Sequence, residues 1–200
     1  MLDGTRERTE GARLASLMGI PNLLTLLRIG LVPIFVLVFY LPFKSAHIAT
    51  AAIFALAAVT DWLDGFLARK LGQVSALGAF LDPVADKLMV AVALVLLVQT
   101  HPTAWFALPA ALIVGREIII SGLREWMAEI GKRTSVAVSI MGKFKTGSQM
   151  LALILLLYRE PIAGLPITAI GFVLLYLAAG LTLWSMVIYL RAAWPGLISK

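Results

Sequence analysis

The sequence predicts an all-α integral membrane protein, a bundle of six transmembrane helices. Three observations predict this fold: 60% of the 200 residues are hydrophobic, the mean hydropathy is +0.94, and the apolar residues cluster in long runs. A soluble domain of this length needs a smaller apolar share to build its core. The sequence contains no cysteine, which excludes disulfides and thiolate metal sites.

The apolar runs have the length that a membrane requires. At a rise of about 1.5 Å per residue, about 20 helical residues cross about 30 Å of hydrocarbon. The expected spans are 21–41, 46–69, 78–98, 104–123, 142–158 and 165–190. Short connections separate them, except for a longer polar connection that begins at residue 124. We therefore expect one transmembrane domain, residues 20–200, preceded by a tail or surface helix of residues 1–19.

Basic residues are distributed unevenly between the two sides of the predicted bundle. Nearly all Lys and Arg residues of the tails and connections lie on the side of the two termini, and only Lys44 and Arg159 lie on the other. The positive-inside rule therefore predicts that both termini are cytoplasmic. The net charge of +6 is spread between apolar spans. Anionic lipid headgroups or a phosphorylated substrate are thus the expected partners, rather than nucleic acid.

Four aspartates lie in or beside the second and third apolar runs. Asp61 and Asp64 are three residues apart in the second run. Asp82 and Asp86 are four apart in the third, so on helices each pair projects from one face. By helical rise, both pairs lie about 6–12 Å from the predicted cytoplasmic ends. Four unpaired carboxylates at this depth are costly and repel one another, which predicts a bound hard divalent cation such as Mg²⁺ or Mn²⁺.

Most other polar residues of the spans fall near the same cytoplasmic ends, whereas the outer halves carry almost no charge. A polar chamber that opens to the cytoplasm and to lipid favours an enzyme that joins a water-soluble substrate to a lipid. A cation transporter should instead carry polar groups near the midplane and a route to the far side. A divalent-cation transporter is nevertheless the alternative from a different functional class.

The aspartates belong to a longer motif, Asp-x-x-Asp-Gly-x-x-Ala-Arg, eight residues, then Gly-x-x-x-Asp-x-x-x-Asp, over residues 61–86. It resembles the signature of the CDP-alcohol phosphatidyltransferases, six-span membrane enzymes that transfer a phosphatidyl group from a CDP-linked lipid to an alcohol and release CMP. The flanks resemble the bacterial phosphatidylglycerophosphate synthases of this family, which use CDP-diacylglycerol and sn-glycerol 3-phosphate. The resembling stretches are 20–42, 57–69, 78–87, 116–138, 142–146 and 181–190.

The resemblance implies that Asp61, Asp64, Asp82 and Asp86 hold two Mg²⁺ or Mn²⁺ ions. It also implies that Asp86 takes the proton from the acceptor hydroxyl. The residues expected to bind the CDP-lipid are Asn22, Thr25, Gly65, Ala68, Arg69 and Gly78. Helix packing alone would also explain each small residue of this set. A helix cap and a hydroxyl bonded to its own helix are the alternatives for its Asn and Thr.

A dianionic acceptor requires cations beyond the motif arginine. The candidates for binding its phosphate are Arg116, Arg124, Lys143, Lys145 and Arg28. Arg116 has an alternative role in a buried pair with Glu117, and Arg28 has one in neutralising the aspartates. The nearest alternative function keeps the chemistry and changes the acceptor to serine, inositol or phosphatidylglycerol. The resemblance further implies a homodimer in the bacterial inner membrane, surrounded by its lipids.

Overall fold

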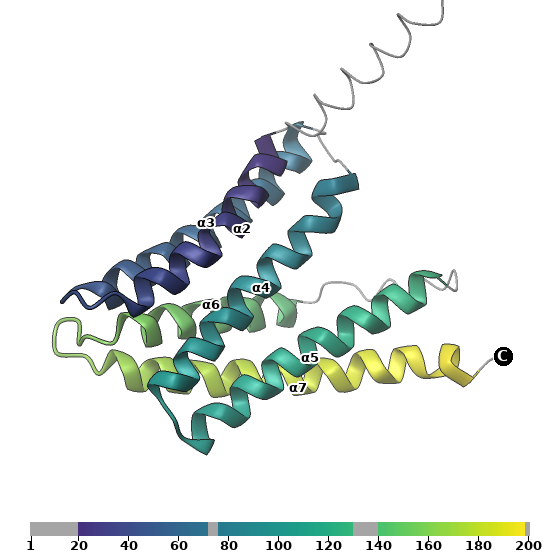
Figure 1. Cartoon of the computed structure of the whole chain (residues 1–200). Helices are drawn as coiled ribbons and strands as arrows, with labels where there is room; N and C mark the ends of the chain where they lie inside the picture. Colours follow the sequence, from purple (N-terminus) through teal and green to yellow (C-terminus); the bar gives the residue numbers. More distant parts are fainter. Residues whose placement is uncertain (1–19, 72–75, 130–139, 199–200) are drawn as a thin grey trace, which may run out of the picture. The chain divides into compact units, whose positions relative to one another are not determined.

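The computed structural model describes residues 20–71, 76–129 and 140–198. Within these ranges, some side chains near helix ends lie outside the described set, among them those of residues 64–71 and Lys143. The described residues form six helices and no strand, apart from an isolated bridge between Ile162 and Leu165 (Figure 1). The all-α fold is therefore confirmed, while the tail of residues 1–19 lies outside the described residues.

Four of the six helices follow the predicted spans to within two residues, whereas α5 and α7 continue six and eight residues past their predicted ends. They are α2 (Ile20–Tyr40), α3 (Ala46–Leu71), α4 (Ala76–Thr100), α5 (Ala104–Glu129), α6 (Ile140–Tyr158) and α7 (Ile167–Ile198). Four stretches are long and apolar enough to cross a membrane, namely Asn22–Tyr40, Ala46–Leu63, Ala104–Met127 and Ile167–Arg191. The apolar part of α6, Phe144–Tyr158, is shorter. A multi-pass membrane protein follows from these lengths, and the count of six spans stays a prediction.

α5 continues beyond the point where the sequence predicts a polar connection. The expected connection begins at residue 124, whereas the helix ends at Glu129. Ile113, Ile120 and Met127 explain the difference, because they recur at every second turn and are all buried. The apolar face of the helix thus extends past the first charged residues of the connection.

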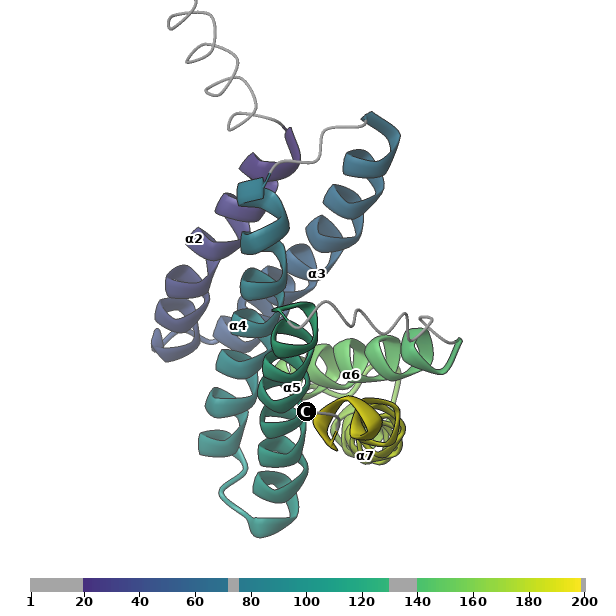
Figure 2. The ribbon, with the colours of Figure 1, turned by 90° about the vertical axis from the view of Figure 1, so that its right-hand side faces the viewer.

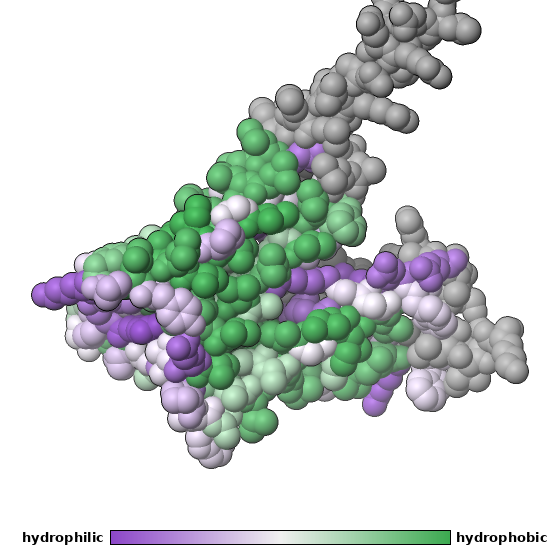
Figure 3. All heavy atoms as spheres, in the orientation of Figure 1, coloured by the Kyte–Doolittle hydropathy of each residue, from purple (hydrophilic) through white to green (hydrophobic). Residues whose placement is uncertain are grey.

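The chain divides into two compact units, Met1–Val92 and Ala93–Lys200, and the boundary lies within α4. In the N-terminal unit, α2 packs against α3. Phe35 and Phe54 meet in this interface with ring centroids 6.1 Å apart, beside the buried small residues Ala51 and Ala57. Large apolar side chains such as Leu37 point outward instead, and hydrophobic residues cover most of the visible surface of α2 and α3 in Figure 3. Lipid tails are the surroundings that such a surface requires.

In the C-terminal unit, α7 packs against both α5 and α6. The chain runs in opposite directions along α6 and α7 in Figure 1, and Figure 2, which views α7 nearly along its axis, shows that α6 crosses it at an angle. The turn between them has positive φ angles at Arg159, Ala163 and Gly164, of 63°, 51° and 79°. Such angles allow the chain to reverse within a few residues. At the other face of α7, the Tyr176 hydroxyl donates a 2.6 Å hydrogen bond to the carbonyl of Trp105 on α5.

Gly171 sets the close approach of α7 to α6. A Cβ atom at this position would lie 2.8 Å from Cγ of Leu156, a fully buried residue of α6. We expect Gly171→Val to lower the free energy of unfolding by about 1–3 kcal/mol, because the added carbons must displace packed side chains. Thermal unfolding in detergent measures the effect.

Gly180 provides the matched control, because it lies on the same helix and a Cβ atom added there would meet no packed neighbour within 4 Å. Gly180→Val should leave the unfolding temperature much closer to that of the parent protein. Equal losses in the two variants would show that helix propensity, rather than packing between α6 and α7, controls the stability of this region.

Candidate active site

One face of α2 contacts both of the predicted aspartate pairs. Thr25 and Arg28 are three residues apart on this helix and are fully buried. The Thr25 hydroxyl donates to Oδ1 of Asp82 on α4, and the Arg28 guanidinium donates to Oδ1 of Asp61 on α3. The structure therefore brings one aspartate from each pair to neighbouring positions on α2.

The amphipathic pattern of α2 is the reverse of that in a soluble helix. Asn22, Thr25 and Arg28 follow one another at three-residue intervals and are buried, whereas Leu23 and Leu26 are exposed. In a soluble protein, the leucines would form the buried face. In a membrane, a polar face must turn inward, so this pattern places donors where the aspartates need them.

The structure describes only part of the predicted motif. Gly78 is buried, and Asp61, Asp82 and Asp86 are partly accessible. The side chains predicted at Asp64, Gly65, Ala68 and Arg69 lie outside the described set. Among the described side chains, no three acidic or histidine groups lie together as a metal site would require. The four-aspartate site therefore stays a prediction.

The residues present nevertheless fit a hard divalent cation. Carboxylate oxygens are the donors that Mg²⁺ and Mn²⁺ prefer. One of these carboxylates, that of Asp61, already contacts a cationic group, Arg28. This contact is the neutralising role considered for Arg28 from the sequence, and its role toward the acceptor phosphate stays a prediction.

A second polar site lies in the C-terminal unit and consists of Arg116, Glu117 and Lys145, which we name the cation cluster. The Arg116 guanidinium donates to Oε1 of Glu117 at 3.0 Å, and the Lys145 ammonium contacts the same oxygen at 2.6 Å. The side chains of Arg116 and Lys145 are only 9% and 8% exposed. Two buried cations thus contact one carboxylate oxygen, and such a pair of cations is suited to binding an anion.

α7 contributes two residues to this site that the sequence analysis missed. Ser185 accepts a 3.2 Å hydrogen bond from Nη2 of Arg116. The Tyr189 hydroxyl accepts one of 2.6 Å from Arg124, and its ring centroid lies 5.0 Å from that guanidinium and 5.8 Å from that of Arg116. Polar residues at helical spacing within the apolar run of α7 were the available signal. Lys143, also predicted to bind the acceptor phosphate, lies outside the described side chains.

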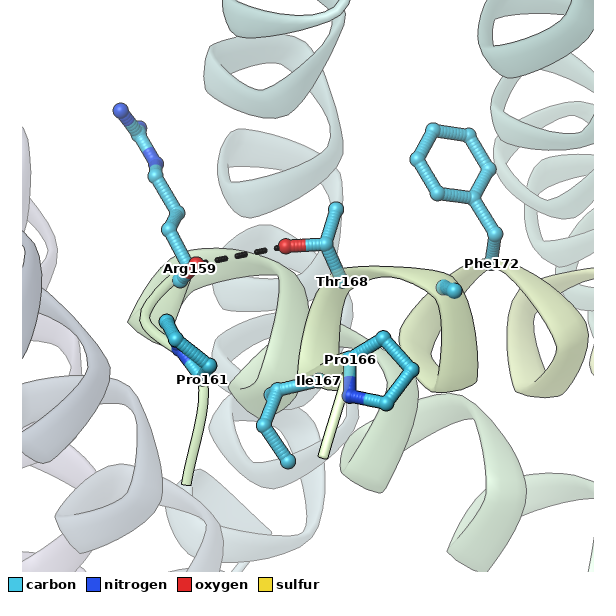
Figure 4. A pocket seen from close by; sticks show the side chains of 7 residues that line it. Arg159, Pro161, Pro166, Ile167, Thr168 and Phe172 are labelled. Carbon is cyan, nitrogen blue, oxygen red and sulfur yellow. Dashed lines mark hydrogen bonds between the residues drawn. The ribbon is translucent and has the colours of Figure 1, made fainter. Parts of the chain in front are cut away.

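A pocket of about 470 Å³ lies at the turn between α6 and α7 (Figure 4). Its lining residues are Arg159, Pro161, Pro166, Ile167, Thr168, Ala169 and Phe172. The ring of His101 packs against Phe172, and burial, followed by the positive charge of Arg159, lowers the pKa of His101. No lining residue is acidic, and none is a site residue predicted from the sequence. The pocket is therefore not a candidate for the transfer chemistry.

Comparisons with known proteins agree with the motif. A profile of the CDP-alcohol phosphatidyltransferase family matches residues 18–184. A CDP-diacylglycerol–glycerol-3-phosphate 3-phosphatidyltransferase from Pseudomonas fluorescens is 58% identical over 181 residues, which cover 90% of this chain and 92% of the relative. Relatives with the same name occur in Sodalis glossinidius, with 60% identity over 88% of this chain and 95% of the relative, and in Yersinia pestis strain Pestoides F, with 59% identity over 90% and 98%.

The contact between Arg28 and Asp61 should contribute to stability. We expect Arg28→Met to lower the free energy of unfolding by about 1–3 kcal/mol, because Asp61 loses a charged hydrogen-bond donor. In an Asp61→Asn background, the same substitution should cost about 0.5–3 kcal/mol less. Chemical unfolding of the four proteins in detergent without added divalent ions measures this coupling.

Arg191→Met, on the exposed side of α7, is the control and should change stability by less than about 0.5 kcal/mol. If Arg28→Met has the same cost in both backgrounds, the contact with Asp61 does not account for its effect.

Proposed function

The chain belongs to the CDP-alcohol phosphatidyltransferase family, and from that premise we propose that it transfers the phosphatidyl group of CDP-diacylglycerol to sn-glycerol 3-phosphate. The products are phosphatidylglycerophosphate and CMP, so the protein is a transferase of phospholipid biosynthesis. The observation that carries this function is the identity of 58–60% over about nine-tenths of the chain to relatives named for this reaction.

The four motif aspartates, Asp61, Asp64, Asp82 and Asp86, are the proposed ligands of two Mg²⁺ or Mn²⁺ ions. Such ions, when bound, neutralise the charge of the pyrophosphate that is cleaved. The contacts from α2 support this proposal, because Thr25 and Arg28 fix the positions of Asp82 and Asp61. Asn22, Gly65, Ala68, Arg69 and Gly78 complete the proposed CDP-lipid site.

Asp86 is the proposed general base. Its carboxylate accepts the proton of the acceptor's 1-hydroxyl, and the oxygen then attacks the phosphorus that bears diacylglycerol. The new bond joins that oxygen to phosphorus. The bond that breaks joins the same phosphorus to the bridging oxygen of the pyrophosphate, and CMP leaves with the electron pair. The phosphate of the acceptor takes no part in the exchange of bonds.

The cation cluster is the proposed site for this acceptor phosphate. Two buried cations that share one carboxylate oxygen favour a further anion, and glycerol 3-phosphate supplies a dianion. Serine is zwitterionic and inositol is neutral, so neither supplies a dianion to these cations. Arg124 is assigned to the same proposed site because it donates a hydrogen bond to the hydroxyl of Tyr189 on α7. Lys143 and Arg28 are further candidates.

The location and assembly of the protein are proposed from the sequence. Apolar helices make it a multi-pass membrane protein, and the basic residues support an inner-membrane topology with both termini in the cytoplasm. A homodimer is proposed from the family resemblance.

The acceptor is tested by CMP release from purified protein in detergent, with CDP-diacylglycerol and Mg²⁺ or Mn²⁺. Glycerol 3-phosphate, serine and inositol are supplied in separate reactions. We expect release only with glycerol 3-phosphate, because the cation cluster requires an anionic acceptor.

A reaction without acceptor gives the background of CDP-diacylglycerol hydrolysis. Release with serine or inositol would retain the transfer chemistry and overturn the proposed acceptor. If folded protein releases CMP with none of them, the transfer reaction itself is wrong, and flux of divalent cations into liposomes then tests the transporter alternative.

Asp86→Asn tests the general base. The amide cannot take a proton from the acceptor, so we expect the transfer rate to fall by about 100-fold or more. Thermal unfolding of the variant should match that of the parent protein. Glu125→Gln removes an exposed carboxylate of α5 as a control and should leave the rate unchanged. A fully active Asp86→Asn protein would remove this residue from the mechanism.

A further inference from the structure

Two arginines of α5 contact the ring of a single tyrosine on α7. Arg116 and Arg124 are eight residues apart in the sequence, which is about 12 Å along a helix axis. The central carbons of their guanidinium groups nevertheless lie 5.8 and 5.0 Å from the ring centroid of Tyr189. Both distances are within the range of a cation–π contact. One side chain of α7 therefore brings together two cationic groups from different turns of α5.

Tyr189 contacts the two arginines in different ways. Its hydroxyl accepts a 2.6 Å hydrogen bond from Nη2 of Arg124, so that arginine meets both the ring and the hydroxyl. Arg116 meets the ring alone and also donates to Ser185, which lies four residues before Tyr189 on the same face of α7. Tyr189 thus supplies every contact that the structure describes for the Arg124 side chain, whereas Arg116 has other partners.

The exposure of these residues lets an anion reach them from water. Arg124 is exposed and Tyr189 is partly exposed, whereas the side chain of Arg116 is 9% exposed. A guanidinium presents five N–H donors in a planar fork that matches the oxygens of a phosphate. Arg124 uses one of these donors on Tyr189 among the described residues, so others are available to an anion.

We propose that Tyr189 is a positioning residue for the phosphate of the acceptor. The inference rests on the proposed function, in which Arg116 and Arg124 bind that phosphate. The ring and the hydroxyl of Tyr189 keep the exposed Arg124 side chain beside Arg116 before the acceptor arrives. Binding then does not have to order a long side chain, which would otherwise weaken it. Tyr189 itself touches neither the reacting hydroxyl nor the phosphorus that it attacks.

The experiment measures kcat and the KM for glycerol 3-phosphate at saturating CDP-diacylglycerol. Tyr189→Phe keeps the ring and removes the hydrogen bond with Arg124, so this KM should rise by about threefold to tenfold. The kcat should change by less than about twofold, because the arginines bind the phosphate equally before and during the exchange of bonds. Tyr189→Leu removes the ring as well and should raise the KM by about tenfold or more. The KM for CDP-diacylglycerol should stay unchanged in both variants.

An Arg124→Met background separates positioning from a merely structural role. In this background, Tyr189→Phe should have no further effect on the KM for glycerol 3-phosphate, because the group that the hydroxyl holds is absent. Tyr189→Leu should still raise it, since Arg116 loses its contact with the ring. If Tyr189→Phe raises the KM equally in both backgrounds, its hydroxyl does not act through Arg124 and the inference is wrong.

Tyr176→Phe is the matched control, because this tyrosine of α7 also forms a 2.6 Å hydrogen bond to α5, with the carbonyl of Trp105. It should leave the KM for glycerol 3-phosphate unchanged. An unchanged KM in Tyr189→Phe, or a fall in kcat with a higher KM for both substrates, would overturn the positioning role. Tyr189→Phe decides the question by itself if Tyr189→Leu does not fold. Failure of the parent protein to use glycerol 3-phosphate at all would instead refute the proposed function, and this inference with it.

Discussion

A charge that lies among apolar helices must be matched within the protein, because lipid tails offer neither water nor counterions. In the N-terminal unit, this constraint explains why the polar face of α2 turns inward and why Arg28 contacts Asp61. In the C-terminal unit, it explains why Glu117 serves two cations at once. The helices are placed by apolar packing, but the positions of their ionised groups follow from this requirement for partners.

The two units provide partners for their buried charges in opposite ways. Near the motif aspartates, a buried arginine contacts Asp61 and a buried hydroxyl contacts Asp82. In the cation cluster, two buried cations contact one carboxylate oxygen. A phosphoryl transfer needs both kinds of site, one that attracts cations to the pyrophosphate and one that attracts an anionic acceptor. The aspartate motif and the cation cluster therefore agree with the reaction proposed from family membership.

Much of the fold and part of the site could be predicted from the sequence. Hydropathy predicts the helices, and motif spacing identifies the aspartates. Hydropathy and spacing can be read from the sequence because each depends only on residues that are close together in the chain. The end of α5 was missed, since the buried Met127 extends its apolar face past charged residues. Ser185 and Tyr189 were missed because their partners, Arg116 and Arg124, lie 69 and 65 residues away in the chain. Spacing within one helix carries no information about such contacts.

The burial of Arg116 and Lys145 also bears on how the protein responds to its ionic surroundings. Mobile ions screen charges at a surface within about 10 Å at 0.1 M salt, but they screen buried charges much less. Polybasic segments on a membrane surface consequently lose their attraction for phosphates as salt rises. The attraction of the cation cluster for an anion should therefore depend less on ionic strength than that of a surface segment.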